Sequence, residues 1–232
     1  MTENRQQIET ALRASFIFSV LPPAERERFI ASARRQSWGA GATIFSMGDP
    51  GDSMVLVETG EVRISYSAPD SRAVLLSELA AGDVFGEIAL LDGGERSADA
   101  TAGTNCTLLF FERKAFMDLL ENNWLLTEAV LKLVCSRLRR SDERMADLAF
   151  FDLPRRLAKA LLARARPAPG GGPLRVNDTQ AALAAQVGGS RENVNRYLRK
   201  WQHDGLITVA DRRISLLDTE GLARVVGSFK AE

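Results

Sequence analysis

The residues from Phe85 to Ala98 have types and spacing suited to holding a small anion that also carries a hydroxyl group. Gly86 opens a short helical turn and lets the backbone approach a ligand closely, and the first N–H groups of that turn favour an anion. Arg96 can bind a phosphate through its planar guanidinium, and Glu87 can accept a hydrogen bond from a sugar hydroxyl. The simpler alternative is a hairpin with ordinary surface charges.

A second group of candidate residues lies near the C-terminus, where two short helices are predicted. Thr179 can cap a first helix that continues through Ala184, and Ser190 can cap a second helix from Arg191 to about Gln202. The glycines at 188 and 189 predict a turn between them. Two short helices joined by a glycine turn are typical of a helix-turn-helix.

The second of these helices has one apolar and one polar face. Its apolar residues recur at helical spacing and are expected in the core: Val194, Tyr197, Leu198 and Trp201. The polar face suits the reading of base edges in the major groove of DNA, because arginine can bind guanine and glutamate can accept from cytosine. The candidates on both helices are Thr179, Gln180, Ser190, Arg191, Glu192, Asn193, Asn195, Arg196 and Arg199. A solvated amphipathic helix is the alternative.

Two short β-rich runs follow, at residues 205–209 and 213–217, and are joined by a polar turn. We expect them to form the wing of a winged helix. Arg212 and Arg213 lie at its tip, where they can contact phosphate.

The rest of the chain supplies the elements that must position these residues. Helix is expected from the N-terminus to about Ser37, and a compact all-β barrel or sandwich from Trp38 to Arg113. The chain then predicts a long helix from about Asn123 to Phe150, and a shorter one from Arg155 to Arg164 after a hinge at 151–154. The expected strands of the barrel are residues 43–45, 54–57, 62–66, 74–76 and 107–111.

The long helix carries residues separated alternately by three and four positions, which is the period of two helices packing side by side. No second helix of this kind occurs in the chain, so a parallel homodimer is the simplest arrangement. Ser141 is polar within the seam and is a candidate for ligand contact. The expected apolar contacts are Leu131, Val134, Leu138, Met145 and Leu148.

Composition sets broad limits. The 232 residues are 45% hydrophobic and 26% charged, no apolar run has the length of a membrane span, and the polar N-terminus lacks a signal-peptide core, so we expect a cytoplasmic protein without a membrane partner. Cys106 and Cys135 form no pair and are expected to be buried. Residues 153–232 hold 14 basic and 7 acidic side chains, although the net charge of the chain is zero. The basic C-terminal part is therefore a candidate for binding a polyanion.

The order of these motifs resembles the CRP/FNR family of bacterial transcription factors over nearly the whole chain, and within it the cyclic-AMP receptor subgroup. The resemblance implies an α+β fold with a jelly-roll-like, cyclic-nucleotide-binding β-roll (1–122), a dimerisation helix and hinge (123–152) and a winged helix-turn-helix DNA-binding domain (153–232). It implies that Arg96 and Ser97 bind the cyclic phosphate of cAMP, and that Glu87, supported by Arg137, binds the ribose. The loop at 165–174 is a candidate contact for RNA polymerase. The implied nucleotide-binding residues are Gly86, Glu87, Ile88, Ala89, Arg96, Ser97, Arg137, Ser141 and Asp142.

Double-stranded DNA is the implied partner, with Ser190, Arg191, Glu192 and Arg196 matching the pattern that reads palindromic GTGA-type half-sites. Two positions depart from the subgroup. Asp142 replaces a hydroxyl residue that contacts adenine, so cGMP is an alternative to cAMP. Gln180 and Ala182 replace charged residues at the start of the first helix of the helix-turn-helix.

Other functions fit this sequence less well. An enzyme or channel that shares the cassette lacks support, because the chain has no membrane run, no catalytic triad and a single histidine, His203, expected at the surface. An iron–sulfur sensor needs four cysteines and a haem sensor needs axial ligands, so neither cofactor nor a metal is expected. A regulator that responds to another ligand, or binds DNA constitutively, stays open.

Overall fold

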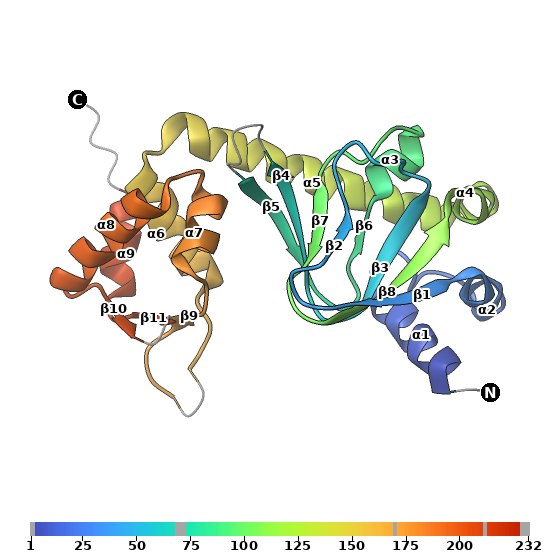
Figure 1. The fold of residues 1–232 in the computed structure, drawn as a ribbon, viewed down its shortest axis with the longest axis horizontal. Coiled ribbons are helices and arrows are strands. Elements are labelled where there is room, and N and C mark those ends of the chain that lie inside the picture. Colours follow the sequence, from blue (N-terminus) through green and yellow to red (C-terminus); the bar gives the residue numbers. More distant parts are fainter. Residues whose placement is uncertain (1–2, 68–72, 169–170, 211–212, 228–232) are drawn as a thin grey trace. The chain divides into compact units, whose positions relative to one another are not determined.

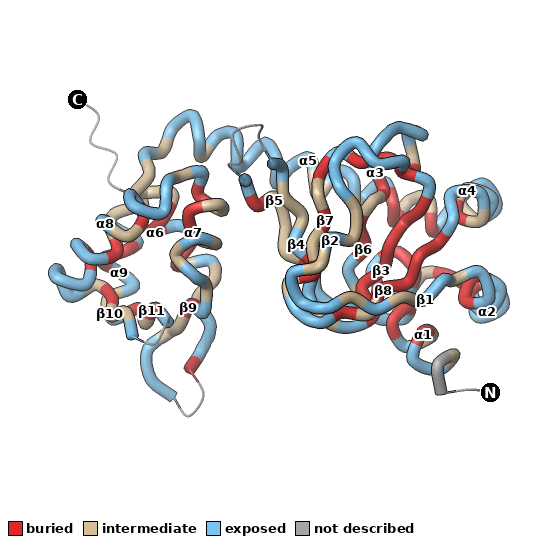
Figure 2. Tube along the Cα trace, viewed as in Figure 1, coloured by how far each residue is buried: buried red, intermediate tan, exposed pale blue. Residues whose placement is uncertain are grey.

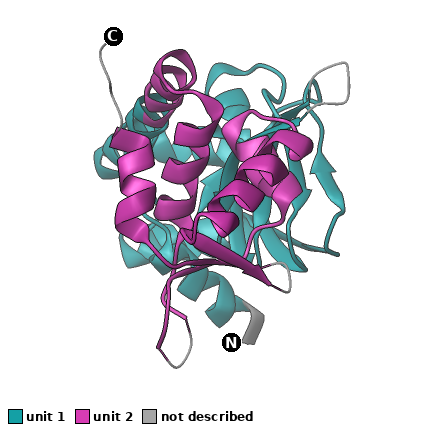
Figure 3. Ribbon diagram, turned by 90° about the vertical axis from the view of Figure 1, so that its left-hand side faces the viewer, with its two compact units in different colours: residues 1–139 teal, residues 140–232 magenta. Residues whose placement is uncertain are grey.

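The computed structural model describes residues 3–67, 73–168, 171–210 and 213–227. They form two compact units, residues 1–139 and 140–232 (Figure 3). The division falls inside the longest helix, α5 (Trp124–Phe150). None of the helices in these ranges has the length and apolar character needed to cross a bilayer.

Unit 1 begins with two helices, α1 (Glu3–Ala14) and α2 (Pro23–Ser32), followed by strand β1 (Arg34–Trp38) (Figure 1). The expectation of helix as far as Ser37 is therefore wrong at its end. β1 pairs antiparallel with β8 (Cys106–Glu112), with Arg34 opposite Phe110. The segment is mostly polar, so its conformation is set by pairing with a strand distant in sequence rather than by a local pattern.

Two antiparallel four-stranded sheets form the β-roll, in the orders β1-β8-β3-β6 and β2-β7-β4-β5. Every predicted strand is confirmed. The short strands β6 and β7 were not predicted, because two to four residues carry too little pattern. The remaining strands are β2 (Thr43–Phe45), β3 (Ser53–Thr59), β4 (Val62–Ser67), β5 (Ala73–Leu79), β6 (Val84–Phe85) and β7 (Asp99–Ala102).

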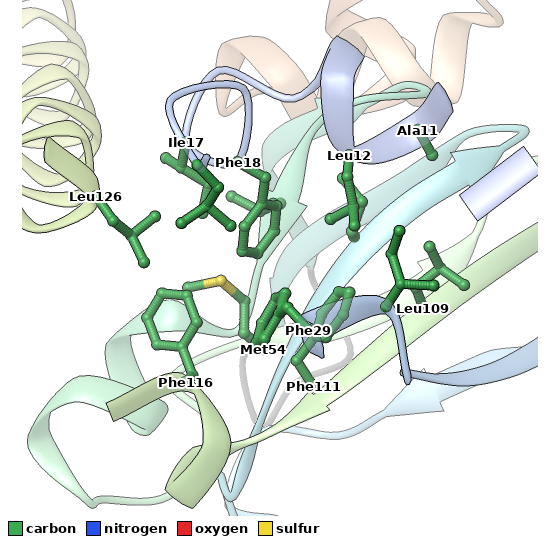
Figure 4. Packing of buried hydrophobic residues seen from close by; sticks show 14 of the residues in the cluster. Ala11, Leu12, Ile17, Phe18, Phe29, Met54, Leu109, Phe111, Phe116 and Leu126 are labelled. Atoms are coloured by element: carbon green, nitrogen blue, oxygen red, sulfur yellow. The ribbon is translucent and has the colours of Figure 1, made fainter. Parts of the chain in front are cut away.

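Strand β3 is buried at every residue except its last, Thr59, as Figure 2 shows. Successive side chains of a strand point to opposite faces, and here they join two different cores. Val55 and Val57 pack between the sheets, whereas Met54 and Leu56 face a second cluster. That second cluster includes four phenylalanine rings and Leu126 from the start of α5 (Figure 4): Phe18, Phe29, Phe111 and Phe116.

The short helix α3 (Glu87–Asp92) follows β6, and α4 (Arg113–Asn122) leads into α5. The first turns of α5 belong to the core of unit 1, because Leu126, Ala129 and Val130 are buried. All five apolar residues predicted for the dimer seam lie at the surface of the single chain. Their exposed fractions are Leu131 54%, Val134 38%, Leu138 61%, Met145 59% and Leu148 56%.

Unit 2 folds around its own apolar core, which includes Leu157, Leu198 and Trp201. The break after α5 lies where the hinge was expected: Asp152 caps α6 by accepting a hydrogen bond from the Arg155 backbone N at 3.2 Å. The helices of unit 2 that follow α5 are α6 (Leu153–Arg164), α7 (Gln180–Val187), α8 (Arg191–His203) and α9 (Thr219–Gly227).

The predicted wing is confirmed as an antiparallel pair, β10 (Ile207–Ala210) and β11 (Arg213–Leu216). A third strand, β9 (Arg175–Val176), joins β11 and was not predicted. Arg213 is exposed at the start of β11, whereas Arg212 lies outside the described residues.

Candidate functional site

Arg96 is a buried cation held by backbone and side-chain oxygens of the β-roll. Its side chain is buried, with the whole residue 5% exposed. Nη1 donates to the carbonyls of Ser53 at 2.8 Å and Gly86 at 3.1 Å, and Nη2 donates to the Ser53 hydroxyl at 2.9 Å. The guanidinium also lies over the Phe45 ring, 4.3 Å from its centroid. These contacts hold the Arg96 side chain in a single rotamer.

The charge of Arg96 is not neutralised by direct contact with a carboxylate in the described part of the chain, and its buried Nε lacks a hydrogen-bond partner there. Burial lowers the pKa of Arg96, while Asp52, Asp49 and Glu87 act at longer range to raise it. A buried charge is costly when it is left unpaired. The cation therefore fits an anionic ligand placed beside it.

Glu87 and Arg137 form an ion pair inside unit 1. Glu87 opens α3 and its side chain is 2% exposed, whereas Arg137 reaches from α5 and its side chain is 31% exposed. Arg137 also donates to the backbone carbonyl of Val84, the first residue of β6. The pair thus brings together two of the predicted site residues, fifty positions apart, and orients the Glu87 carboxylate.

The backbone turn at Gly86 is required by the same arrangement. Gly86 has φ +77°, and a Cβ placed on it would lie 2.3 Å from Nη1 of Arg96. A side chain at this position would therefore strain the backbone and displace the guanidinium. Ala89 is buried and lies against Gly51, while Ile88 and Ser97 are exposed.

Ser141 and Asp142 are both exposed on α5. They belong to unit 2 and the cassette to unit 1, so their part in a common site stays a prediction. Cys106 is buried as expected. The expectation that Cys135 is buried is wrong, because it lies on the part of α5 that extends beyond the core of unit 1.

Sequence reasoning missed the partners of Arg96. Phe45 and Ser53 lie far upstream in the chain and reach Arg96 only through the curvature of the sheets. A polar residue at the start of a strongly apolar strand is the one weak signal that Ser53 offered. The Val84 carbonyl, which holds Arg137, is a backbone group and gives no sequence signal.

The helix-turn-helix of unit 2 is built by the predicted caps. The Thr179 hydroxyl accepts from the Ala182 backbone N at 3.1 Å, and the Ser190 hydroxyl accepts from the Asn193 backbone N at 3.2 Å. Gly188 has φ +62° and ends α7. Val194, Leu198 and Trp201 are buried as predicted, and Tyr197 is half-buried.

The opposite face of α8 is open to solvent over most of its candidates. Asn195 is half-buried and His203 is exposed. The pKa of the Glu192 carboxyl is lowered by hydrogen bonds from its own backbone N–H and from Ser190, which keeps it an acceptor. The exposed candidates on α8 and its cap are Ser190, Arg191, Glu192, Asn193, Arg196 and Arg199.

A shallow depression of about 240 Å³ joins α7, α8 and the wing. Gln180 from the start of α7 lines it together with Asn195, Arg199 and Gln202 from α8, and with Val209 from β10. The structure thus brings three of the predicted DNA-contacting residues, Gln180, Asn195 and Arg199, around one hollow.

The sequence matches known proteins over both units. The cyclic nucleotide-binding domain family matches residues 35–123, and the Crp-like helix-turn-helix domain family matches residues 155–225. A CRP-like cAMP-activated global transcriptional regulator of Mycobacterium tuberculosis is 34% identical, over 94% of this chain and 99% of that protein. This chain belongs to the CRP/FNR family of transcription regulators.

A second relative supports that assignment, and one solved structure supports the fold. The cyclic AMP receptor protein of Thermus thermophilus is 34% identical over 89% of this chain and 97% of its own length. The solved structure of the c-di-GMP responsive regulator CLP of Xanthomonas campestris matches with a TM-score of 0.76 at 24% identity, covering 84% of this chain and 99% of that one. The CRP/FNR chain is thus a cyclic-nucleotide-binding, DNA-binding transcription regulator and not an enzyme, with the expected α+β fold.

Proposed function

We propose that this CRP/FNR regulator is a homodimer that binds cAMP and, in response, recognises palindromic DNA with GTGA-type half-sites. The observation that carries the proposal is the buried Arg96 guanidinium, which contacts no carboxylate among the described residues and lies against the Gly86 turn. A cyclic phosphate has the charge and size that complement such a cation. The names of the two relatives that are 34% identical support cAMP as the nucleotide that carries this phosphate.

In this proposal each part of the nucleotide has a separate group of residues. Arg96 and Ser97 bind the cyclic phosphate, with Gly86, Ile88 and Ala89 supplying the backbone beside it. The Glu87 carboxylate accepts a hydrogen bond from the ribose 2′-hydroxyl, and Arg137 keeps that carboxylate oriented, which is supported by their ion pair. Binding by preset groups loses little conformational entropy, which favours tight binding.

Ser141 and Asp142 are proposed to contact the base from α5. A hydroxyl and a carboxylate can both accept a hydrogen bond from the exocyclic amino group of adenine. A carboxylate can also accept from N1 and N2 of guanine, so cGMP is the natural competitor in any binding test. The choice between the two bases is the part of the effector assignment that depends most on Asp142.

For DNA, we propose that Arg191, Glu192 and Arg196 read base edges in the major groove. Their exposure on α8 leaves them free to do so, and an arginine bidentate to guanine is the commonest specific contact. The remaining candidates position the helix by contacting phosphates or neighbouring bases: Thr179, Gln180, Ser190, Asn193, Asn195, Arg199, Arg212 and Arg213.

Dimerisation is proposed to occur through the exposed seam of α5, in parallel orientation. Ligand binding would then shift the population toward dimers whose two recognition helices are one DNA turn apart. In a bacterial cytoplasm the loop at 165–174 is the proposed contact for RNA polymerase.

The test is whether DNA binding depends on added nucleotide. Fluorescence anisotropy with a labelled palindromic GTGA duplex is expected to show tight, saturable binding with cAMP and much weaker binding without it. Arg96→Ala should abolish the cAMP response but not the weak binding. Identical binding curves with and without nucleotide would contradict the proposal and favour a constitutive regulator or a different effector.

A further inference from the structure

The helix α5 carries charged residues beside its seam whose spacing matters once two copies pack in parallel. The seam residues Leu131, Leu138 and Met145 occupy the a positions of the heptad, and Val134, Ser141 and Leu148 the d positions. In a parallel pair, the g residue of one helix faces the e residue five positions later on the other helix, and opposite charges there form interhelical ion pairs. This register turns the sequence of α5 into a prediction of contacts between protomers.

Arg137 occupies a g position, and the e position that faces it in a partner is Asp142. The neighbouring g residues are Val130 and Arg144, whose e counterparts are Cys135 and Ala149. Arg137 with Asp142 is therefore the one g–e pair of opposite charge that the seam offers over these heptads. The register singles out the arginine that already holds Glu87.

The described contacts leave both groups able to make this pair. Arg137 has a side chain that is 31% exposed, although it pairs with Glu87 and donates to Val84. A guanidinium has five N–H donors, so it can serve two carboxylates at once. Asp142 is exposed on α5, and within the described residues its carboxylate takes part in no ion pair.

We propose that Arg137 of one protomer forms an ion pair with Asp142 of its partner, so that one guanidinium orients both Glu87 of its own chain and the carboxylate proposed to contact the base. The inference rests on the parallel homodimer of the proposed function. It makes the partner a contributor to the nucleotide site. It also links base recognition to dimerisation, since the Asp142 carboxylate is oriented only when two chains meet.

The first test compares two charge reversals on neighbouring positions of α5. Asp142→Arg would place two arginines face to face at each of the two symmetric pairs, whereas Glu143→Arg changes the same charge at an outward f position. Sedimentation equilibrium of the full chain should show a dimer weakened about tenfold at low salt by Asp142→Arg and little changed by Glu143→Arg. High salt should reduce the difference between the dimer dissociation constants of the two variants, because it screens exposed charges.

The second test mixes two differently tagged variants, Asp142→Arg and Arg137→Glu. Each homodimer has like charges at both pairs, whereas the mixed dimer has opposite charges at both. Co-purification should recover the mixed dimer well above its statistical share. The control mixes Asp142→Arg with Arg139→Glu, which changes the same charge at an exposed b position. This mixed dimer should form at its statistical share. If Arg137→Glu does not fold, the comparison of Asp142→Arg with Glu143→Arg decides alone.

The outcomes distinguish a failure of the ion pair from a failure of the proposed homodimer. A wild-type chain that stays monomeric with cAMP would overturn the homodimer, and this inference with it. A dimeric wild type in which Asp142→Arg and Glu143→Arg weaken association equally would overturn only the ion pair. Recovery of the mixed dimer at its statistical share would do the same, and so would equal enrichment of the mixed dimer with Arg139→Glu and with Arg137→Glu.

Discussion

The candidate sites of the two units use arginine in opposite ways. In unit 1, Arg96 is 5% exposed and its guanidinium is bound by Ser53, Gly86 and the Phe45 ring. In unit 2, the arginines of α8 project from an exposed helix face, and the Arg196 guanidinium lies over the neighbouring Tyr197 ring, 5.2 Å from its centroid. The same type of side chain is buried and held by hydrogen bonds in unit 1, and exposed in unit 2.

The difference matches the size of what each unit is proposed to bind. A small ligand is bound best by groups already in place, because the protein then loses little entropy on binding. A DNA duplex presents many phosphates, so exposed arginines gain from long-range attraction and released counterions. The comparison predicts that single substitutions at the unit 1 site cause large losses of nucleotide affinity. Single substitutions on the exposed face of unit 2 should each cause a smaller loss of DNA affinity.

The largest effect should come from Arg96→Ala. Truncating one partner of a buried charged contact costs about 2–5 kcal/mol by general experience, so nucleotide affinity is expected to fall by at least about 30-fold. Competition against a fluorescent cyclic nucleotide measures it. The control is Arg63→Ala on β4, whose side chain is 49% exposed and pairs loosely with Glu78 at 3.5 Å.

Circular dichroism must show that the Arg96 variant is folded at the assay temperature, because the Ser53 and Gly86 carbonyls lose a donor. We expect its unfolding free energy to fall by about 1–3 kcal/mol. An affinity equal to that of Arg63→Ala in a folded protein would contradict the placement of the anion at Arg96.

Gly86→Ala tests the geometry of the buried cation without removing its charge. The positive φ and the 2.3 Å approach of a Cβ to Arg96 should cost about 1–3 kcal/mol of stability and reduce nucleotide affinity. Thermal unfolding and the same competition assay report both. Gly39→Ala is the matched control, since a Cβ there meets nothing within 4 Å. Equal affinity in the two variants would show that the turn does not set the position of the guanidinium.

Arg191→Ala tests the exposed side of the comparison. We expect cognate DNA binding to weaken by about 1–3 kcal/mol while binding to unrelated DNA changes far less. Anisotropy titrations with a GTGA palindrome and a scrambled duplex give the two values. Lys200→Ala, on the same helix, should weaken both duplexes alike or neither. A uniform loss with Arg191→Ala would reassign that residue to the phosphate backbone.

The smallest effect should come from an exposed ion pair remote from both sites. Arg13 pairs with Glu9 one turn earlier in α1 at 2.7 Å, and its side chain is 62% exposed. Arg13→Ala should cost no more than about 0.5 kcal/mol of stability. Chemical denaturation measures this, and nucleotide affinity should not change. A loss comparable to that of Arg96→Ala would show that exposure does not separate the two classes of arginine.

Local patterns in the sequence were sufficient where the chemistry is local. The caps Thr179 and Ser190 and the buried face of α8 were predictable because each depends on residues three or four positions apart. The cassette was predictable as a motif, through a family resemblance. Its supporting shell was not, because Ser53, Phe45 and the Val84 carbonyl meet Arg96 and Arg137 only after the sheets have formed.

The same limit explains the elements that were missed. β1 is polar and takes its conformation from β8, and β9 is two residues long and exists because β11 lies beside it. The seam of α5 shows the opposite case, since its 3–4 spacing is a strong local signal for a contact that a single chain does not contain.

The most direct test of the central claim is a calorimetric titration of the full chain with cAMP and, separately, with cGMP. We predict saturable binding of cAMP, tighter than that of cGMP, with the heat abolished in Arg96→Ala and kept in Arg63→Ala. Absence of binding by either nucleotide, or an unaltered titration in folded Arg96→Ala, would contradict the account and leave the Arg96 cassette without its proposed ligand.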